Sequence, residues 1–175
     1  MENHTNSSSS NAKIYTCIWV IPKKKQVVPI LKIKNELNKS LRGPNFPIHM
    51  TLVGDPSLSY LELKGLISEF SNSIPEFKIT YSGFGMKDMF FQAFYVDVIL
   101  NQPLKSIRSK IYKILKKKNQ AFMPHLSLYY GKKNIKTKKI LLDGLPLTEG
   151  SFLVDSLYIV SFDSLNIEWK VLNKI

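Results

Sequence analysis

A short phrase containing a histidine occurs twice in the chain, and it limits the folds that the chain can adopt. The two copies are residues 47–52, Pro-Ile-His-Met-Thr-Leu, and residues 124–128, Pro-His-Leu-Ser-Leu. Side chains alternate between the two faces of a β-strand, so His49 and Thr51 would share one face, as would His125 and Ser127. Each phrase therefore predicts a strand with an imidazole and a hydroxyl side by side.

The same order of elements surrounds both phrases: a strand, an amphipathic helix, the histidine strand, a short helix and a further strand. Hydrophobic periodicity predicts these strands at residues 13–21, 47–54, 77–84, 90–100, 123–130, 151–162 and 165–172. It predicts helices at residues 26–41, 59–71 and 102–118, and a weak helix or only a turn within 132–143. This internal duplication predicts a bilobal α+β fold. We expect two antiparallel sheets with outer helices around a central cleft, related by a pseudo-two-fold axis.

Composition indicates one soluble globular domain. The chain has 175 residues, and we expect a disordered polar tail at residues 1–12 followed by a single domain at 13–175. Cys17 is the only cysteine and lies in an apolar strand, which excludes a disulfide framework and favours a reducing, cytoplasmic location. No signal peptide or membrane-spanning stretch is evident.

The chain is strongly basic, with a net charge of +12. A basic surface attracts anionic substrates. Arg42 and Arg108 are the only arginines, and specific nucleic-acid contacts rely on arginine forks. The charge therefore favours general attraction of anions over a dedicated, long nucleic-acid groove.

Two strands that each present an imidazole and a hydroxyl would place two proton carriers around one small anion. That combination is suited to phosphoester chemistry without a metal. A single histidine on a strand is more often structural, but two copies at matching places favour catalysis, and His4 in the tail is given no role. We expect no metal site, because neither phrase has a cysteine or an acid beside its histidine and Asp55 alone completes no ligand set.

The two phrases resemble the motifs of the 2H (two-histidine) phosphoesterase superfamily. Residues 46–54 and 122–130 are most similar to its cyclic phosphodiesterase branch, and so are Trp19 and residues 91–95. The resemblance covers residues 13–172. It implies a bilobal α+β fold and hydrolysis, without metal or cofactor, of a 2',3'-cyclic nucleotide or of ADP-ribose 1'',2''-cyclic phosphate to a monoester.

The resemblance also implies roles for the four motif residues. His125 would be the general base and His49 the general acid, although the two phrases are too alike for the sequence itself to distinguish them. The hydroxyls of Thr51 and Ser127 would hold the non-bridging phosphate oxygens, where charge builds up.

Substrate-binding residues are harder to assign. Strict strand alternation places Tyr129 on the face of His125, whereas the resemblance favours Tyr130, beyond the strand end, as the aromatic residue of the cleft. Both tyrosines would alternatively pack in the core. Gln92 is a polar residue in an apolar run and is a further candidate, and Phe84 would form a rim over a base.

Two alternatives remain open. The first is a phosphodiesterase on the same fold that acts on 2',5'-oligoadenylate or on RNA ends. The second is a non-catalytic RNA-binding module whose histidines only contact phosphate. In the favoured hypothesis, a small cyclic phosphate or an RNA end is the partner, with no membrane and no obligate protein partner, and the protein is a monomer.

Overall fold

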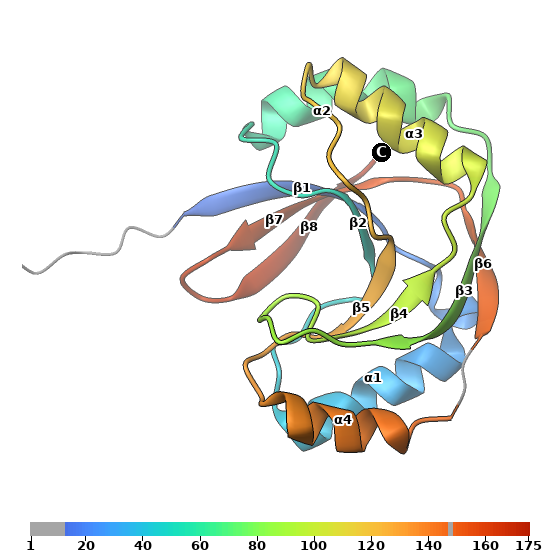
Figure 1. Ribbon diagram of the computed structural model, residues 1–175. Coiled ribbons are helices and arrows are strands. Elements are labelled where there is room, and N and C mark those ends of the chain that lie inside the picture. Colours follow the sequence, from blue (N-terminus) through green and yellow to red (C-terminus); the bar gives the residue numbers. More distant parts are fainter. Residues whose placement is uncertain (1–12, 147–148) are drawn as a thin grey trace, which may run out of the picture.

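The fold consists of two four-stranded antiparallel sheets with a layer of helices on either side (Figure 1). It was obtained as a computed structural model, which describes residues 13–146 and 149–175. The expected tail at residues 1–12 lies outside the described residues. No helix in the described part of the chain is both long and apolar enough to cross a bilayer.

The first sheet has the strand order β2-β1-β7-β8 and the second the order β5-β4-β3-β6. The strands of the first sheet are β1 (Ile14–Val20), β2 (Met50–Val53), β7 (Tyr158–Asp163) and β8 (Glu168–Lys174). Those of the second are β3 (Phe77–Gly85), β4 (Phe94–Val98), β5 (His125–Tyr129) and β6 (Glu149–Val154). The two orders match, because each sheet begins with a histidine strand, then has the first strand of that half and then a strand from the other half. The predicted α+β fold with a pseudo-two-fold relationship is confirmed.

Each helical layer also takes one helix from each half. The helices are α1 (Val28–Leu41), α2 (Tyr60–Asn72), α3 (Gln102–Ile114) and α4 (Ile135–Asp143), and a short 3₁₀ turn at Lys24–Gln26 precedes α1. In Figure 1, α2 and α3 lie together on one side of the molecule, and α1 and α4 on the other. The Ser-x-x-Glu pattern at residues 59–62 of the sequence forms a capping box at the start of α2. The Ser59 side chain accepts from the Glu62 backbone N–H, and the Glu62 carboxylate accepts from the Ser59 backbone N–H.

The two histidine strands are edge strands, and they meet where the sheets adjoin. The backbone N–H of Ser127 on β5 donates to the carbonyl of His49, just before β2, at 3.1 Å. This hydrogen bond joins the two motifs directly. A single hydrophobic cluster extends across both sheets beneath this junction.

The prediction of one strand at residues 151–162 is wrong, because these residues form two strands that belong to different sheets. β6 pairs with β3, whereas β7 pairs with β1. The chain passes from one sheet to the other at residues 155–157. In this crossing the backbone N–H of Leu157 donates to the carbonyl of Ile175, and the carbonyl of Leu157 accepts from the N–H of Ile175, so the buried backbone is paired. Because the Leu157 side chain is fully buried, the apolar sequence pattern of the two strands continues through the crossing.

The predicted strand at residues 90–100 is too long at its N-terminal end. β4 begins only at Phe94, and residues 86–93 form a loop closed by a hydrogen bond from Lys87 N–H to Gln92 O at 3.0 Å. Gln92 has a left-handed conformation (φ 62°), which no regular strand contains. Residues 86–93 therefore form a loop that precedes β4 and are not part of that strand.

Candidate active site

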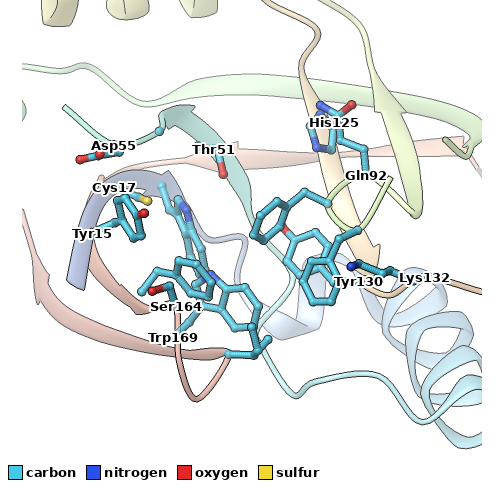
Figure 2. A pocket seen from close by; sticks show the side chains of 16 residues that line it. Tyr15, Cys17, Thr51, Asp55, Gln92, His125, Tyr130, Lys132, Ser164 and Trp169 are labelled. Atoms are coloured by element: carbon cyan, nitrogen blue, oxygen red, sulfur yellow. The ribbon is translucent and has the colours of Figure 1, made fainter. Parts of the chain in front are cut away.

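A cavity of about 750 Å³ opens between the two sheets. Its walls come from β1, β2 and β5, from the loop of residues 86–93, and from the β7–β8 hairpin (Figure 2). Four of the eight residues proposed from the sequence as catalytic or substrate-binding line it: Thr51, Gln92, His125 and Tyr130. The fold thus brings predicted site residues from three separate segments of the chain into one cavity.

His49 lies behind the cavity wall and is fully buried. Its ring is stacked on the indole of Trp19, with centroids 3.4 Å apart and planes 10° apart. Nδ1 of His49 donates to the carbonyl of Pro47 at 2.8 Å. Because a carbonyl only accepts, Nδ1 carries the proton, and Nε2 of the neutral ring is left with its lone pair.

His125 is held in the same way on the other strand. Its Nδ1 donates to the carbonyl of Met123 at 2.9 Å, again two residues upstream. The edge of its ring packs against Tyr95, with centroids 5.2 Å apart. Each motif therefore uses its own backbone to fix the imidazole tautomer, so that Nε2 is the reactive nitrogen in both.

Tyr130 connects His49 to the second motif. Its hydroxyl lies 3.1 Å from Nε2 of His49 and 2.8 Å from Oγ of Ser127. A hydroxyl has one proton, so it accepts in one of these bonds while it donates in the other. Neutral His49 accepts at Nε2, and the hydroxyl of Tyr130 then donates to it and accepts from Ser127.

The ring of Tyr130 is clamped by aromatic side chains from three other segments. It stacks on Phe46 at a centroid distance of 4.3 Å, and it contacts Phe91 at 5.2 Å and Trp169 at 5.3 Å. Gly131 follows it, and its N–H donates to the carbonyl of Phe90. Packing on several sides fixes the position of this hydroxyl.

Burial dominates the electrostatics of the two histidines. It lowers the pKa of His49 to about 3, with a smaller contribution from the charge of His125. Burial also lowers the pKa of His125, assisted by the charge of Lys87 and opposed by the hydrogen bond to Met123 and by Asp97. Both imidazoles are consequently neutral near pH 7 in the unligated protein.

Ser127, Tyr129 and Phe84 do not line this cavity. Ser127 is buried behind the wall, where it bonds Tyr130. Tyr129 lines a separate hollow, and its ring packs so closely against Gly43 that a Cβ there would lie 2.5 Å away. Phe84 packs against the hydrophobic core. Of the two tyrosines that the sequence left as alternatives for the cleft, Tyr130 lines this cavity, because β5 ends at Tyr129 and the next residue turns inward.

The β7–β8 hairpin supplies a wall that the sequence did not indicate. Phe162 and Trp169 face each other across the hairpin, stacked at a centroid distance of 4.8 Å, and both line the cavity. Lys132 lines it as well. The available signal was an aromatic residue on each side of the short gap between the predicted strands at residues 151–162 and 165–172.

Among the described residues, no three His, Cys, Asp or Glu side chains are grouped so that they could hold a metal ion. Asp55 lines the cavity without a second acid beside it on that wall. The polar groups that line the cavity are therefore imidazole, hydroxyl, amide and ammonium groups, with one carboxylate, Asp55, and one thiol, Cys17.

Comparison with known proteins decides the family. The sequence profile of the 2'-5' RNA ligase superfamily, the 2H phosphoesterases, matches residues 22–166. The chain belongs to this superfamily. Membership supports an enzyme of the phosphoesterase type and agrees with the resemblance of the two histidine phrases. No curated protein matches the chain.

Solved structures share the fold at low sequence identity. The protein TT0787 of Thermus thermophilus is 15% identical, with a TM-score of 0.62 over 92% of this chain and 96% of that one. LigT of E. coli in its apo form is 14% identical, with a TM-score of 0.60 over 92% and 95%. LigT complexed with 3'-AMP is 15% identical, with a TM-score of 0.60 over 92% and 96%. These proteins are built on the same pair of sheets.

Proposed function

We propose that the protein hydrolyses a cyclic phosphodiester, a 2',3'-cyclic nucleotide or ADP-ribose 1'',2''-cyclic phosphate, to a phosphomonoester by acid–base catalysis without metal. The observation that carries this proposal is the matched pair of imidazoles. His49 and His125 both donate Nδ1–H to a carbonyl two residues upstream, and their strands are joined by one backbone hydrogen bond. In both rings Nε2 is therefore the nitrogen that transfers the proton.

The reaction needs two proton transfers. The oxygen of a water attacks phosphorus and forms the new P–O bond, the bond from phosphorus to one ribose oxygen breaks, and that oxygen takes a proton. A base must remove a proton from the water and an acid must supply one to the ribose oxygen. Each transfer is typically worth about 10²–10⁴-fold in rate.

Burial favours His49 as the base and His125 as the acid, the reverse of the assignment implied by the resemblance. With its pKa lowered to about 3 by burial, His49 carries no proton on Nε2 near pH 7 and so has none to give as the acid. His125 borders the cavity, where the negative charge of a bound phosphate would raise its pKa and favour the protonated form.

The proton passes to His49 through Tyr130. Because the aromatic neighbours hold the Tyr130 ring, we do not expect the hydroxyl to leave Nε2 of His49 when a phosphate binds. The hydroxyl instead gives its proton to His49 as it takes one from the attacking water. Ser127 supports this hydroxyl rather than the phosphate, whereas Thr51, in the cavity wall, donates to a non-bridging oxygen.

The aromatic walls suit a nucleoside. The rings of Phe91 and Trp169 both line the cavity, and a base stacked on such a ring is typically worth about 1–3 kcal/mol. A solved relative, LigT, was complexed with 3'-AMP, a nucleotide bearing a phosphate on its ribose. Gln92, held in the loop beside His125, would contact a polar edge of the base (Figure 2).

A second candidate is cleavage of 2',5'-linked RNA, favoured by the name of the superfamily whose profile matches. The same two imidazoles would act, but the leaving group would be the 5'-oxygen of a further nucleotide. The two candidates differ in substrate and not in the groups that transfer protons.

The test is turnover of the four 2',3'-cyclic nucleotides, ADP-ribose 1'',2''-cyclic phosphate and 2',5'-oligoadenylate, each with and without EDTA. We expect a cyclic phosphate to be hydrolysed equally well in EDTA, and His125→Ala to lose about 10²-fold or more. Loss of activity in EDTA that a divalent ion restores would refute the proposal. So would salt-dependent RNA binding without turnover of any substrate, which is the behaviour of a binding module.

A further inference from the structure

A second hollow, of about 400 Å³, shares Trp169 with the main cavity as a lining residue. Its other walls come from the first half of α1 and from the segment before β2. The polar side chains that line it are Lys24, Lys34, Asn35 and Asn45. No carboxylate is among its lining residues, so it is a cationic hollow beside the candidate active site.

Lys34 is the unusual residue of this hollow. It is only 2% exposed, although lysines are almost never buried without a partner. No described carboxylate pairs with its ammonium group, whereas Lys23, Lys39 and Lys138 each have one. Its contact is the face of Phe46, with Nζ 4.2 Å from the ring centroid. Burial accordingly lowers the pKa of Lys34 to about 8, with no neighbouring acid to oppose the effect.

A buried ammonium without a counter-ion is costly, and an anion in the hollow would offset that cost. The hollow is also placed to receive part of the same substrate. Phe46 lies between Lys34 and Tyr130, packed at 4.2 Å from the ammonium and 4.3 Å from the Tyr130 ring. Trp169 contacts Phe46 at 5.4 Å and lines both spaces.

We propose that the Lys34 hollow binds a second phosphate group of the substrate, one nucleoside away from the cyclic phosphate at His125. This inference rests on the proposed function and narrows its substrate class. The substrate would carry two phosphate centres, either the phosphodiester next to a cyclic RNA end or the pyrophosphate of ADP-ribose cyclic phosphate. A cyclic mononucleotide would fill only the main cavity.

The kinetic test compares three adenine substrates: 2',3'-cyclic AMP, an ApA dinucleotide ending in a 2',3'-cyclic phosphate, and ADP-ribose 1'',2''-cyclic phosphate. For each two-phosphate substrate, the quantity measured is its kcat/KM divided by that of cyclic AMP. Any effect of Lys34 on the nearby His49 cancels in this ratio. We expect Lys34→Met to lower the ratio about tenfold through KM, because the second phosphate loses a charge-assisted hydrogen bond.

Lys32→Met is the matched control, because Lys32 is more exposed on the same helix and is absent from the walls of this hollow. Its ratio should equal that of the wild type. Loss with the dinucleotide alone would identify an RNA end as the source of the second phosphate, and loss with ADP-ribose cyclic phosphate alone would identify the pyrophosphate. An unchanged ratio for both substrates in Lys34→Met would overturn the inference.

A measurement without turnover separates this site from the proposed function. The dissociation constant of ADP, used as the probe, is measured by calorimetry for the wild type, Lys34→Met and Lys32→Met. We expect Lys34→Met to weaken ADP binding about tenfold and Lys32→Met to leave it unchanged. Weaker binding of ADP to Lys34→Met, with no hydrolysis of any substrate by the wild type, would retain the anion site and refute the proposed function. Hydrolysis by the wild type, with ADP bound equally well by the wild type and Lys34→Met, would retain the proposed function and overturn the anion site.

Discussion

The hydroxyl of Tyr130 lies 3.1 Å from Nε2 of His49 and is the only hydrogen-bond partner of that nitrogen within the described part of the chain. One motif histidine therefore borders the cavity directly, whereas the other reaches it through a tyrosine contributed by the opposite motif strand. Two nearly symmetrical sequence phrases thus produce an asymmetric site. This asymmetry has measurable consequences for rate, for leaving-group dependence and for stability.

Tyr130→Phe should lower kcat by about 10²-fold, the usual contribution of a single proton transfer. The ring and its aromatic contacts are retained, so KM and the melting temperature should change little. Tyr129→Phe is the control, since Tyr129 packs outside the cavity. A Tyr130→Phe enzyme as fast as the wild type, or faster, would show that the hydroxyl merely covers His49.

The acid and the base can be distinguished with an aryl phosphodiester, whose leaving group departs without a proton. His125→Ala should lose much less activity on this substrate than on a cyclic phosphate, because only the acid becomes dispensable. His49→Ala should lose similar factors on both. If His49→Ala instead loses much less activity on the aryl ester than on the cyclic phosphate, His49 is the acid. Steady-state kinetics with a chromogenic aryl ester and with 2',3'-cyclic AMP suffice for the comparison.

Burial of His49 should make the fold sensitive to acid. The folded pKa of about 3 lies below the ordinary value of 6.5, so between these values the unfolded chain binds a proton that the folded chain does not. Stability is therefore lost as the pH falls through this window, by up to about 1.4 kcal/mol per pH unit. Urea unfolding of the wild type and of His49→Gln at pH 7, 5 and 4 should show a steeper loss for the wild type. Parallel losses would contradict this expectation.

Lys138 should control the loop of residues 86–93. This fully buried lysine of α4 donates to the carbonyl of Lys87 and lies 3.7 Å from the carboxylate of Asp88. Lys138→Met leaves that carbonyl unpaired, which typically costs about 1–3 kcal/mol, and loosens the loop that carries Gln92. We expect KM to rise several-fold and hydrogen exchange in the loop to accelerate. Lys136→Met, on the exposed face of the same helix, should change neither quantity.

The sequence was sufficient wherever a local rule decides the outcome. The capping box at Ser59 gave the start of α2, and alternation placed both motif phrases on strands. The interruption at residues 155–157 was missed because buried Leu157 continues the apolar pattern while its backbone bonds the chain terminus. The covering of His49 by the side chain of Tyr130 was also not predicted. It depends on the residue at which β5 ends and on rings from segments far apart in the chain, and no local periodicity encodes such contacts.

The matching strand orders bear on how such a chain could arise. Each sheet has as its third strand an element from the opposite half, β7 in one sheet and β3 in the other. If one half were expressed alone, the strand that it contributes to the other sheet would be unpaired. The exposed backbone N–H and C=O groups of that strand could then pair with another chain. Two copies of one half could pair these backbone groups by exchanging that strand, as in a domain-swapped dimer. β7 and β3 therefore tie the two halves together, so neither half can be excised without depriving the other of a strand.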